Sequence, residues 1–381
     1  MSFLYIDNTA DLITYCARAS QQPAIAVDTE FVRTRTFYPQ LGLIQIYDGH
    51  AVALVDPLAI NDITALVDLF ANPAVVKVLH ACSEDLETFL HAFDMLPQPI
   101  FDTQIAAGYA KVGPVMGYGR MVEVMLETTL EKGESRTDWL KRPLSPEQLQ
   151  YAAEDVLYLL PCYEKLIASL PAHKIQWVYA EIEQLGLRKS AQLDPQDAYL
   201  MFKNTWKLAP QNLAVLQALG AWRLEYAKTH DITQNFIARE TSLYEIATKL
   251  PTHKGALFQL EMVAPQEARK HGQTFVDIVK TVKQRDPASY PAKQYRLTNM
   301  PNYKPTFAKI KALCQDVAEQ VDCDVAEIAS KRQIHQVLTW YWWDYDDTRA
   351  WGMQPDLLCG WRAPLLAEKI QHIMQEQGST L

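Results

Sequence analysis

The stretch AIAVDTEFVRTRTFYPQLGLIQIYDGHAVALVDP (residues 24–57) contains three short runs of apolar and β-branched residues, at 24–31, 41–48 and 50–57. Asp48-Gly49, between the second and third runs, is a dipeptide typical of tight hairpin turns. Runs of this length and composition, bounded by turn residues, predict strands. The stretch therefore predicts three strands connected as hairpins.

The segments that follow alternate between helical and strand-like patterns up to about residue 170. An early group of hairpin strands followed by a strand among helices predicts a mixed α/β sheet. The predicted elements are helices at 63–72 and 83–93, a strand at 75–81, and one long amphipathic helix at 145–170.

Two serines mark where two of these helices are expected to begin. Ser83 and Ser145 are predicted N-caps, since a serine hydroxyl accepts a hydrogen bond from the first helical turn. Pro146 stands at the first position of the long helix, where its missing N–H costs nothing.

Beyond about residue 171 the strand signal ends, and 210–380 read as successive helices with a proline-bearing linker at 286–305. The segments LYEIATK (243–249) and VAEIASK (325–331) form a faint repeat that predicts two related helical domains. The predicted division is 1–170 for the α/β domain, 171–207 for a connecting helical segment, and 208–290 and 291–381 for the helical domains.

Charge is distributed unevenly along the chain, whose net charge is −9. Residues 1–170 contain 22 acidic side chains and 11 Lys/Arg, whereas 203–311 contain 8 acidic side chains and 17 Lys/Arg. This asymmetry favours an acidic metal-binding domain beside a basic, phosphate-contacting one.

The bulk properties exclude several classes of protein. No apolar run approaches the roughly 20 residues needed to cross a bilayer, and the N-terminus lacks a basic signal-peptide region. The six cysteines are scattered without a C-x-x-C pair, so neither a zinc site nor a disulfide framework is expected. We expect a cytoplasmic protein with buried free thiols, and nothing in the sequence requires more than a monomer.

Asp28 and Glu30 are two residues apart in a predicted strand, so both carboxylates point to the same face of the sheet. Acidic side chains beside buried strand positions are costly unless they are hydrogen-bonded or bind a metal. The alternative is a pair of exposed acids at a strand end.

Asp85, Tyr151 and Asp155 are the other residues that suggest chemistry. Tyr151 and Asp155 are four residues apart on one face of the long helix, and Asp85 follows a predicted strand-to-helix turn. Taken singly, each is also explained as a solvated helix residue or as an acid favoured by the helix dipole.

Together, these residues resemble the tyrosine subtype of the DEDD exonuclease superfamily. Within it, the chain is similar to the ribonuclease D family, with a second half similar to a helicase-and-ribonuclease-D C-terminal (HRDC) domain at 208–290 and a more diverged copy at 295–375. The segments that carry the resemblance are VDTEFVRTRTFYPQLGLIQI (27–46), VLHACSEDLETF (78–89), FDTQIAAGY (101–109), WLKRPLSPEQLQYAAEDVLYL (139–159) and LLCGWRAPLLAEKI (357–370).

The resemblance implies a ribonuclease H-like α/β domain that hydrolyses RNA from its 3′ end with two divalent metal ions, Mg²⁺ or alternatively Mn²⁺. It implies that Asp28, Glu30 and Asp155 hold the metal that activates water. Asp28 and Asp85 would hold the metal near the leaving oxygen, and Tyr151 would orient the attacking water. The implied substrates are tRNA precursors, and the implied products are nucleoside 5′-monophosphates.

Other residues invite assignment. Arg33, Arg35 and Arg120 are possible RNA contacts or ordinary surface cations. The run WYWWDYDD (340–347) is a possible base-stacking platform, although we favour helix packing. The smaller assignments are a core role for His80, a helix cap for Asp102, and a role for Trp361-Arg362 in locking the last helical domain together.

Two other functions compete with the exoribonuclease reading. A DNA 3′→5′ exonuclease would need the same four acids, because nothing in the motif reports a 2′-hydroxyl. A nucleic-acid-binding module with vestigial catalysis would show normal binding without metal-stimulated hydrolysis. The intact motif favours an enzyme, and the HRDC-like half favours RNA.

Overall fold

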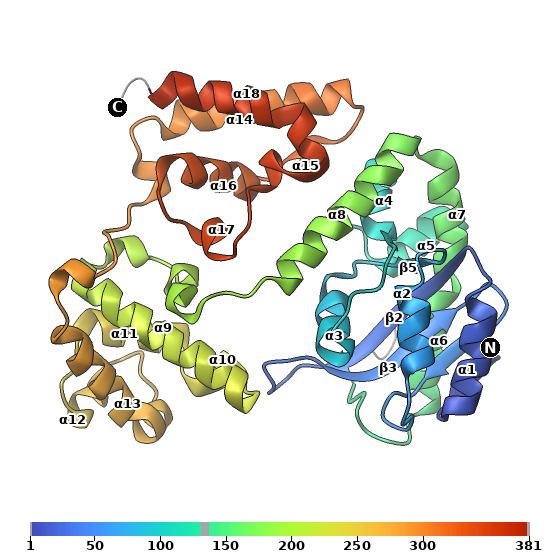
Figure 1. The fold of residues 1–381 in the computed structure, drawn as a ribbon, viewed down its shortest axis with the longest axis horizontal. Coiled ribbons are helices and arrows are strands. Elements are labelled where there is room, and N and C mark those ends of the chain that lie inside the picture. The colour runs from blue at the N-terminus through green and yellow to red at the C-terminus, as the bar shows by residue number, and fades with distance from the viewer. Residues whose placement is uncertain (1, 131–136, 379–381) are drawn as a thin grey trace.

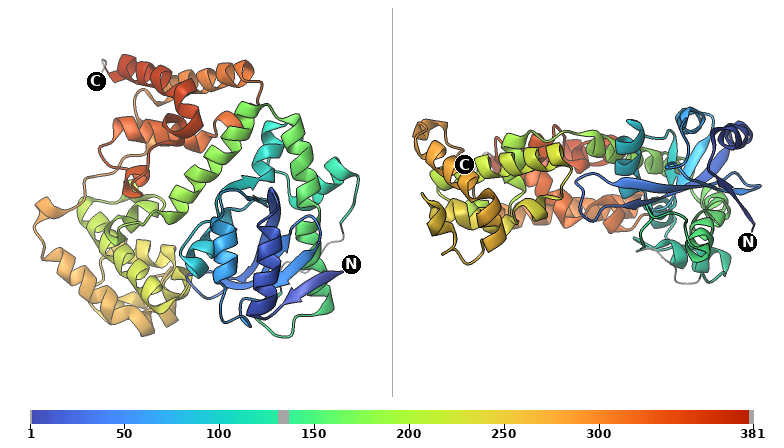
Figure 2. Two further views of the ribbon diagram at one scale, coloured as in Figure 1. Left: turned by 45° about the vertical axis from the view of Figure 1, so that its right-hand side comes forward. Right: turned by 90° about the horizontal axis from the view of Figure 1, so that it is seen from below.

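The computed structural model describes residues 2–130 and 137–378. An N-terminal α/β domain is followed by α8 (Ala172–Ser190) and two helical domains, which both lie on the same side of the α/β domain (Figures 1 and 2). The predicted fold class, a mixed sheet followed by an all-helical second half, is confirmed. No helix in these two described ranges has the length and apolarity required to span a membrane.

The sheet has six strands in the order β1-β4-β3-β2-β5-β6. β3 pairs antiparallel with both β2 and β4, whereas β1/β4, β2/β5 and β5/β6 are parallel. The strands are β1 (Phe3–Ile6), β2 (Ala24–Val32), β3 (Gln40–Tyr47), β4 (Val52–Val55), β5 (Val76–Leu79) and β6 (Ile100–Asp102).

The four strands predicted from sequence are present, and β1 and β6 were missed. Both missed strands lie at the sheet edges and have only four and three residues, too few for a periodic pattern. Each is defined by its parallel pairing with a strand distant in the chain, which local sequence does not report.

Helices cover both faces of the sheet, and alternate strand residues contribute to two separate cores. α1, α2 and α3 pack on one face, over residues that include Val27 and Ile44. α5, α6 and α7 pack on the other, over residues that include Ala26 and Leu43. The helices of this domain are α1 (Thr9–Ala19), α2 (Thr64–Ala71), α3 (Ser83–Phe93), α4 (Thr103–Tyr109), α5 (Tyr118–Leu126), α6 (Pro146–Leu157) and α7 (Leu159–Ser169).

The single helix predicted over 145–170 is wrong, because the segment forms two helices that meet at Tyr158. Pro161 explains the break, since proline clashes with the carbonyl four residues before it and donates no hydrogen bond. The Tyr118 hydroxyl bridges the break by accepting a bond from the Tyr158 N–H (3.3 Å) and donating to the Glu154 carbonyl (2.8 Å). The predicted cap at Ser145 is confirmed, with a complete capping box.

The predicted N-cap at Ser83 is also wrong. α3 begins at Ser83, and its N-cap is Cys82, whose side chain makes no capping bond. Asp102 stabilises this turn instead, because one carboxylate oxygen accepts from the Cys82 N–H (2.8 Å). The other oxygen of Asp102 caps α4 as predicted, accepting from the N–H groups of Gln104 and Ile105.

The two helical domains contain corresponding elements, which supports the predicted relationship but corrects its register. In each domain a long helix is followed by a four-residue helix, α10 or α15, whose C-cap (Ala238 or Ala329) is extended. VAEIASK (325–331) therefore corresponds to QNFIARE (234–240) and not to LYEIATK (243–249). The helices are α9 (Pro210–His230), α10 (Gln234–Ile237), α11 (Glu240–Lys249), α12 (Lys254–Leu257) and α13 (Pro265–Lys283), then α14 (Tyr303–Gln320), α15 (Val325–Ile328), α16 (Lys331–Trp342), α17 (Asp347–Ala350) and α18 (Ala363–Gly378).

Trp361 and Arg362 join the last helical domain to α8 as well as holding it together. Arg362 donates to the carbonyls of Glu327 and Ile328 within the domain, as predicted (both 2.8 Å). Trp361 stacks on Trp177 of α8, with ring centroids 4.2 Å apart, and both Trp361 and Arg362 bind Glu181 of that helix. The domain is therefore fixed to α8 by aromatic stacking and an ion pair.

Candidate active site

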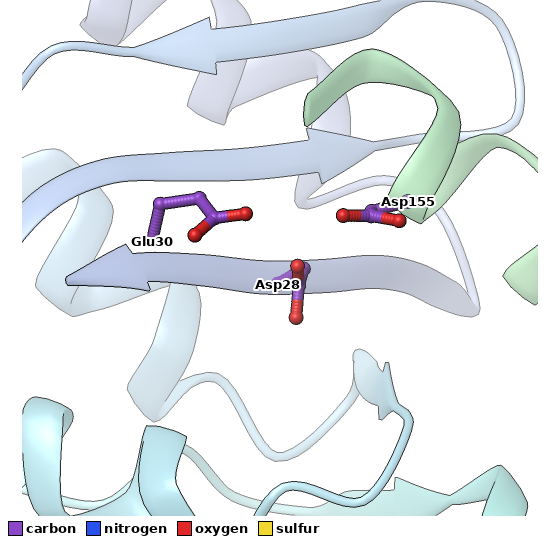
Figure 3. A group of neighbouring side chains, drawn as sticks. All are labelled: Asp28, Glu30 and Asp155. Carbon is purple, nitrogen blue, oxygen red and sulfur yellow. The ribbon is translucent and has the colours of Figure 1, made fainter. Parts of the chain in front are cut away.

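Three carboxylates converge on the face of the sheet that α6 covers. Asp28 and Glu30 lie on β2 and Asp155 lies on α6, and one oxygen from each lies within 4.8 Å of the others (Figure 3). A β-bulge between Glu30 and Phe31 shifts the register immediately after this pair. Bulges re-aim neighbouring side chains and are frequent beside active sites.

Asp85 approaches from the first turn of α3 and is 8% exposed. It is not one of the three carboxylates within 4.8 Å, but its charge raises the pKa of Asp28. The Thr29 hydroxyl, between the two acids of β2, donates a hydrogen bond to Asp85. The structure thus brings all four predicted acids into one region, with three of them in closer contact.

Tyr151 lies one helical turn before Asp155 on α6, and its hydroxyl is hydrogen-bonded to that carboxylate. Burial and the charge of Asp155 raise the pKa of Tyr151 far above its ordinary value. The hydroxyl therefore remains protonated at neutral pH and is available as a hydrogen-bond donor.

Burial and the charges of neighbouring acids raise the pKa values of all four carboxylates when no cation is bound. Burial, followed by the charges of Asp155 and Asp85, raises the pKa of Glu30 to about 9. Burial is also the main reason that the pKa of Asp155 rises to about 7 and that of Asp85 to about 6. The pKa of Asp28 is raised by burial and by all three neighbouring acids.

These residues fit a divalent cation. Oxygen atoms of carboxylates are the ligands preferred by Mg²⁺ and Mn²⁺. In the described residues no Lys or Arg forms an ion pair with Asp28, Glu30, Asp85 or Asp155. A bound cation would compensate the buried negative charge that otherwise raises the four pKa values.

Arg142 anchors the segment that leads into α6. Its guanidinium forms a two-pronged ion pair with Asp56 (2.6 and 2.7 Å) and donates to the Gly42 carbonyl of β3 (2.6 Å). Tyr5 of β1 donates to the same carboxylate (2.6 Å). Because Arg142 stands four residues before α6, this network fixes the start of the helix against the sheet.

Gln45 was missed by the sequence reasoning. It pairs with Asp28 across β2 and β3, so both side chains point to the same face. Gln45 is fully buried, and neither atom of its amide has a hydrogen-bond partner in the described residues. A polar residue in the centre of the apolar run LGLIQIY (41–47) was the signal that could have identified it.

Asp231 was also missed, and it links the first helical domain to the loop that follows β2. One oxygen of its carboxylate accepts from the N–H groups of both Phe37 and Tyr38 (2.9 Å each). Thr233 extends the contact, since its N–H donates to the Arg35 carbonyl (2.9 Å) and its hydroxyl to the Thr36 carbonyl (2.9 Å). Figure 1 shows this loop reaching from β2 and β3 to α10.

We expect the Asp231 contact to affect RNA binding more than hydrolysis. An Asp231→Ala variant loses both hydrogen bonds to the loop. Because hydrogen bonds to a charged acceptor contribute on the order of 1.5–3 kcal/mol, we expect the KM for RNA to rise about tenfold. Steady-state kinetics on a labelled RNA would measure this.

Two further variants control that experiment. Asp231→Asn retains an acceptor oxygen and should restore most of the affinity, while Asp277→Ala, an exposed acid of α13, should have no effect. An unchanged KM in Asp231→Ala would show that the contact plays no part in binding.

The arginines proposed to contact RNA lie at exposed positions. Arg33 pairs with Glu87 of α3, and Arg120 pairs with Glu123 on its own helix at 2.7 Å. Arg35 lies in the loop contacted by Thr233. Their contact with RNA remains a prediction.

His80 behaves as predicted for a core histidine. Its ring nitrogens lie 2.9 Å from the Thr103 hydroxyl and 2.9 Å from the Met116 carbonyl. Both nitrogens are therefore engaged in contacts within the domain.

All six cysteines are free and five of them are buried, as expected from their spacing.

Comparison with known proteins identifies each part of the chain. Residues 3–171 match the 3′-5′ exonuclease family, 212–279 the HRDC domain, and 301–370 the C-terminal HRDC domain of ribonuclease D. These matches span the α/β domain and both helical domains.

Full-length relatives give the same result. Ribonuclease D of Musicola paradisiaca is 43% identical over 98% of this chain and 99% of its own length. Ribonuclease D of Escherichia coli is 40% identical over 99% of both chains, and its crystal structure, described as that of an exoribonuclease involved in structured RNA processing, superposes with a TM-score of 0.91. The catalytic core of RRP6 from Trypanosoma brucei, 24% identical over 74% of this chain and 80% of its own, shares the fold with a TM-score of 0.61. The chain therefore belongs to the ribonuclease D family and is a 3′→5′ exoribonuclease.

Proposed function

We propose that this exoribonuclease trims the 3′ ends of structured RNA, with tRNA precursors as its substrate class, and releases nucleoside 5′-monophosphates. The observation that carries this proposal is the convergence of Asp28, Glu30 and Asp155 within 4.8 Å, beside Asp85. Among the described residues, no Lys or Arg forms an ion pair with these four acids, which suits neutralisation of their charge by metal ions.

In the proposed mechanism, Asp28, Glu30 and Asp155 would hold one divalent ion and Asp85, with Asp28, would help to hold a second, with Mg²⁺ as the expected ion. When bound, two such ions polarise the phosphate and stabilise the attacking and leaving oxygens. Thr29 keeps the Asp85 carboxylate oriented through its hydroxyl. Tyr151, protonated and held by Asp155, orients the attacking water at the 3′-terminal phosphodiester.

The two halves of the chain support a division of labour. The α/β domain is acidic and suits metal binding, whereas 203–311 carry 17 Lys/Arg and 8 acids and suit contact with the RNA backbone. RNA affinity should therefore fall steeply between low and moderate salt. A flat salt dependence would contradict this division. A monomeric state and a cytoplasmic location remain predictions.

The proposal is tested with a 5′-labelled, 3′-extended tRNA-like RNA incubated with Mg²⁺ or with EDTA. We expect stepwise shortening from the 3′ end and 5′-monophosphate products only when Mg²⁺ is present. A matched DNA strand measures the preference for RNA. Shortening in EDTA, or release of 3′-monophosphates, would overturn the mechanism.

Tyr151 should affect the chemical step rather than binding. In Tyr151→Phe the ring and its packing are kept, and only the hydroxyl that orients water is lost. We expect kcat to fall about 10²-fold, the lower end of general acid–base contributions, with KM nearly unchanged. Single-turnover rates at saturating RNA measure this, and Tyr163→Phe on α7 is the matched control. A variant that kept full kcat would remove Tyr151 from the mechanism.

A further inference from the structure

A cavity of about 660 Å³ lies between the two helical domains, in a part of the molecule that the proposed mechanism does not use. One wall is formed by residues 199–206, which precede α9, and another by the linker residues 292–297. The third wall is formed by α16 and the segment that leads into α17. Figure 1 shows these elements in the helical half of the molecule, apart from β2 and α6. The volume is within the range of small-molecule sites.

Aromatic side chains contribute to every wall of this cavity. Trp342, Trp343 and Tyr345, from the run WYWWDYDD, line the third wall, and Trp206 and Tyr295 line the other two. Tyr295 is 63% exposed and Tyr345 is 45% exposed, so neither ring is consumed by core packing. Exposed aromatic rings in a concave site are the platforms on which unpaired bases stack. The helix-packing reading of this run is therefore incomplete, because three of its aromatic residues line a cavity.

Two cations from the basic part of the chain lie beside the ring of Trp206. The guanidinium of Arg296 lies 5.6 Å from the centre of the Trp206 ring, and the Lys207 ammonium lies 5.3 Å from the same ring. Arg332 also lines the cavity. Within the described residues Arg296 forms no ion pair, so it can bind a phosphate.

Two polar atoms of the lining residues lack partners. The Trp343 Nε1–H is a donor and the Gln336 Oε1 is an acceptor, and both are buried without a hydrogen bond in the part of the chain that the structure describes. Buried groups of this kind are costly when left unpaired.

The acidic residues of the third wall are mostly engaged with their own segment. Asp346 caps α17 through the N–H groups of Thr348 and Arg349 and forms an ion pair with the Arg349 side chain. Asp347 accepts from the Thr348 N–H at 3.0 Å. The wall also contains the exposed Asp344. The negative charge of these carboxylates disfavours a phosphate there, which places the sugar–phosphate of a bound nucleotide on the Arg296 side.

We propose that this cavity binds one unpaired nucleotide of the RNA, upstream of the 3′ end that is being hydrolysed. The proposal rests on RNA being the substrate. Such a site would hold the body of the RNA through one single-stranded nucleotide, whatever the RNA sequence at the 3′ end.

The test measures RNA affinity in the hydrolysis-blocked background Asp28→Asn, with a fluorescently labelled RNA that carries a single-stranded segment. We expect Trp206→Leu and Arg296→Gln each to raise Kd about tenfold, as expected for loss of one stacked base or one phosphate contact. The matched controls Phe258→Leu and Lys369→Gln change exposed residues outside the cavity, and Lys369 also lies outside the basic segment 203–311, so both should leave Kd within about twofold. Kd values within twofold of the parent for both cavity variants would overturn the proposal.

Crosslinking tests the same site without relying on the folding of variants. RNA carrying 4-thiouridine at successive positions is irradiated on the Asp28→Asn protein, and crosslinked peptides are identified by mass spectrometry. We expect one upstream position to crosslink to the peptides containing Trp206 or Trp343. Crosslinks confined to the α/β domain would overturn the proposal. Mg²⁺-dependent shortening by the unmodified protein is scored separately, so failure of the enzyme mechanism is distinguishable from failure of this site.

Discussion

Replacing Asp28 by asparagine is expected to reduce the rate of 3′-end hydrolysis by at least about 10³-fold, because the contribution of one preorganised charged group at a reacting centre is of this order. Asp28 lies among the other three acids, each of which raises its pKa, so it is the central carboxylate of the proposed metal site. The change keeps the size of the side chain and removes only its charge. Single-turnover release of labelled 5′-monophosphate in Mg²⁺ measures the effect.

The matched control is Asp68→Asn, which removes an exposed carboxylate from α2 in the same domain. Its hydrolysis rate should equal that of the unmodified protein. RNA binding by Asp28→Asn, measured in EDTA, should be retained, because the proposed phosphate contacts are made by Lys and Arg side chains and not by Asp28. Hydrolysis at more than a tenth of the normal rate in Asp28→Asn would place the reaction elsewhere.

The second large effect is expected on thermal stability, because metal binding and protonation of the carboxylates are both coupled to folding. The pKa values of Asp85, Asp155 and Glu30 are about 6, 7 and 9 in the folded protein, against ordinary values of 3.8, 3.8 and 4.5. At a pH between the ordinary pKa of a carboxyl and its raised pKa in the folded protein, the folded state binds more protons than the unfolded chain. These carboxyls therefore lower the free energy of unfolding as pH rises from about 4 to 9 in the absence of metal.

Metal binding should reverse this loss, since a cation binds the ionised carboxylates and competes with protons. We expect millimolar Mg²⁺ to raise the Tm by about 5 °C at pH 8 and far less at pH 5. In EDTA at pH 8, Asp28→Asn should be more stable than the unmodified protein and should not respond to Mg²⁺. Differential scanning fluorimetry at the two pH values measures both shifts. An equal Mg²⁺ response at both pH values would show that the metal acts at another site.

Features that depend on short-range patterns could be predicted from the amino-acid sequence. The strand that carries Asp28 and Glu30 follows from a short run of apolar and β-branched residues, and the cap of α6 follows from Ser145, Pro146 and Gln148. Both depend on residues within a few positions of each other, whose side chains must share a face or complete a helical turn. Two helix predictions were wrong. The single helix over 145–170 is interrupted near Pro161, and the turn before α3 is stabilised by the distant Asp102 instead of by a Ser83 cap.

Tertiary structure decided which distant residues meet. The Asp231 carboxylate binds backbone groups 193 and 194 residues away, and the orphaned amide of Gln45 is recognised only because β3 pairs with β2. The exposed rings of WYWWDYDD look like core residues until the linker and the segment before α9 are placed opposite them. Sequence spacing fixes which face of an element a side chain occupies, but contacts between elements depend on how whole faces pack. The four acids were identified from their pattern, whereas their closeness, their shared charge and the site between the helical domains come from the packing of the chain.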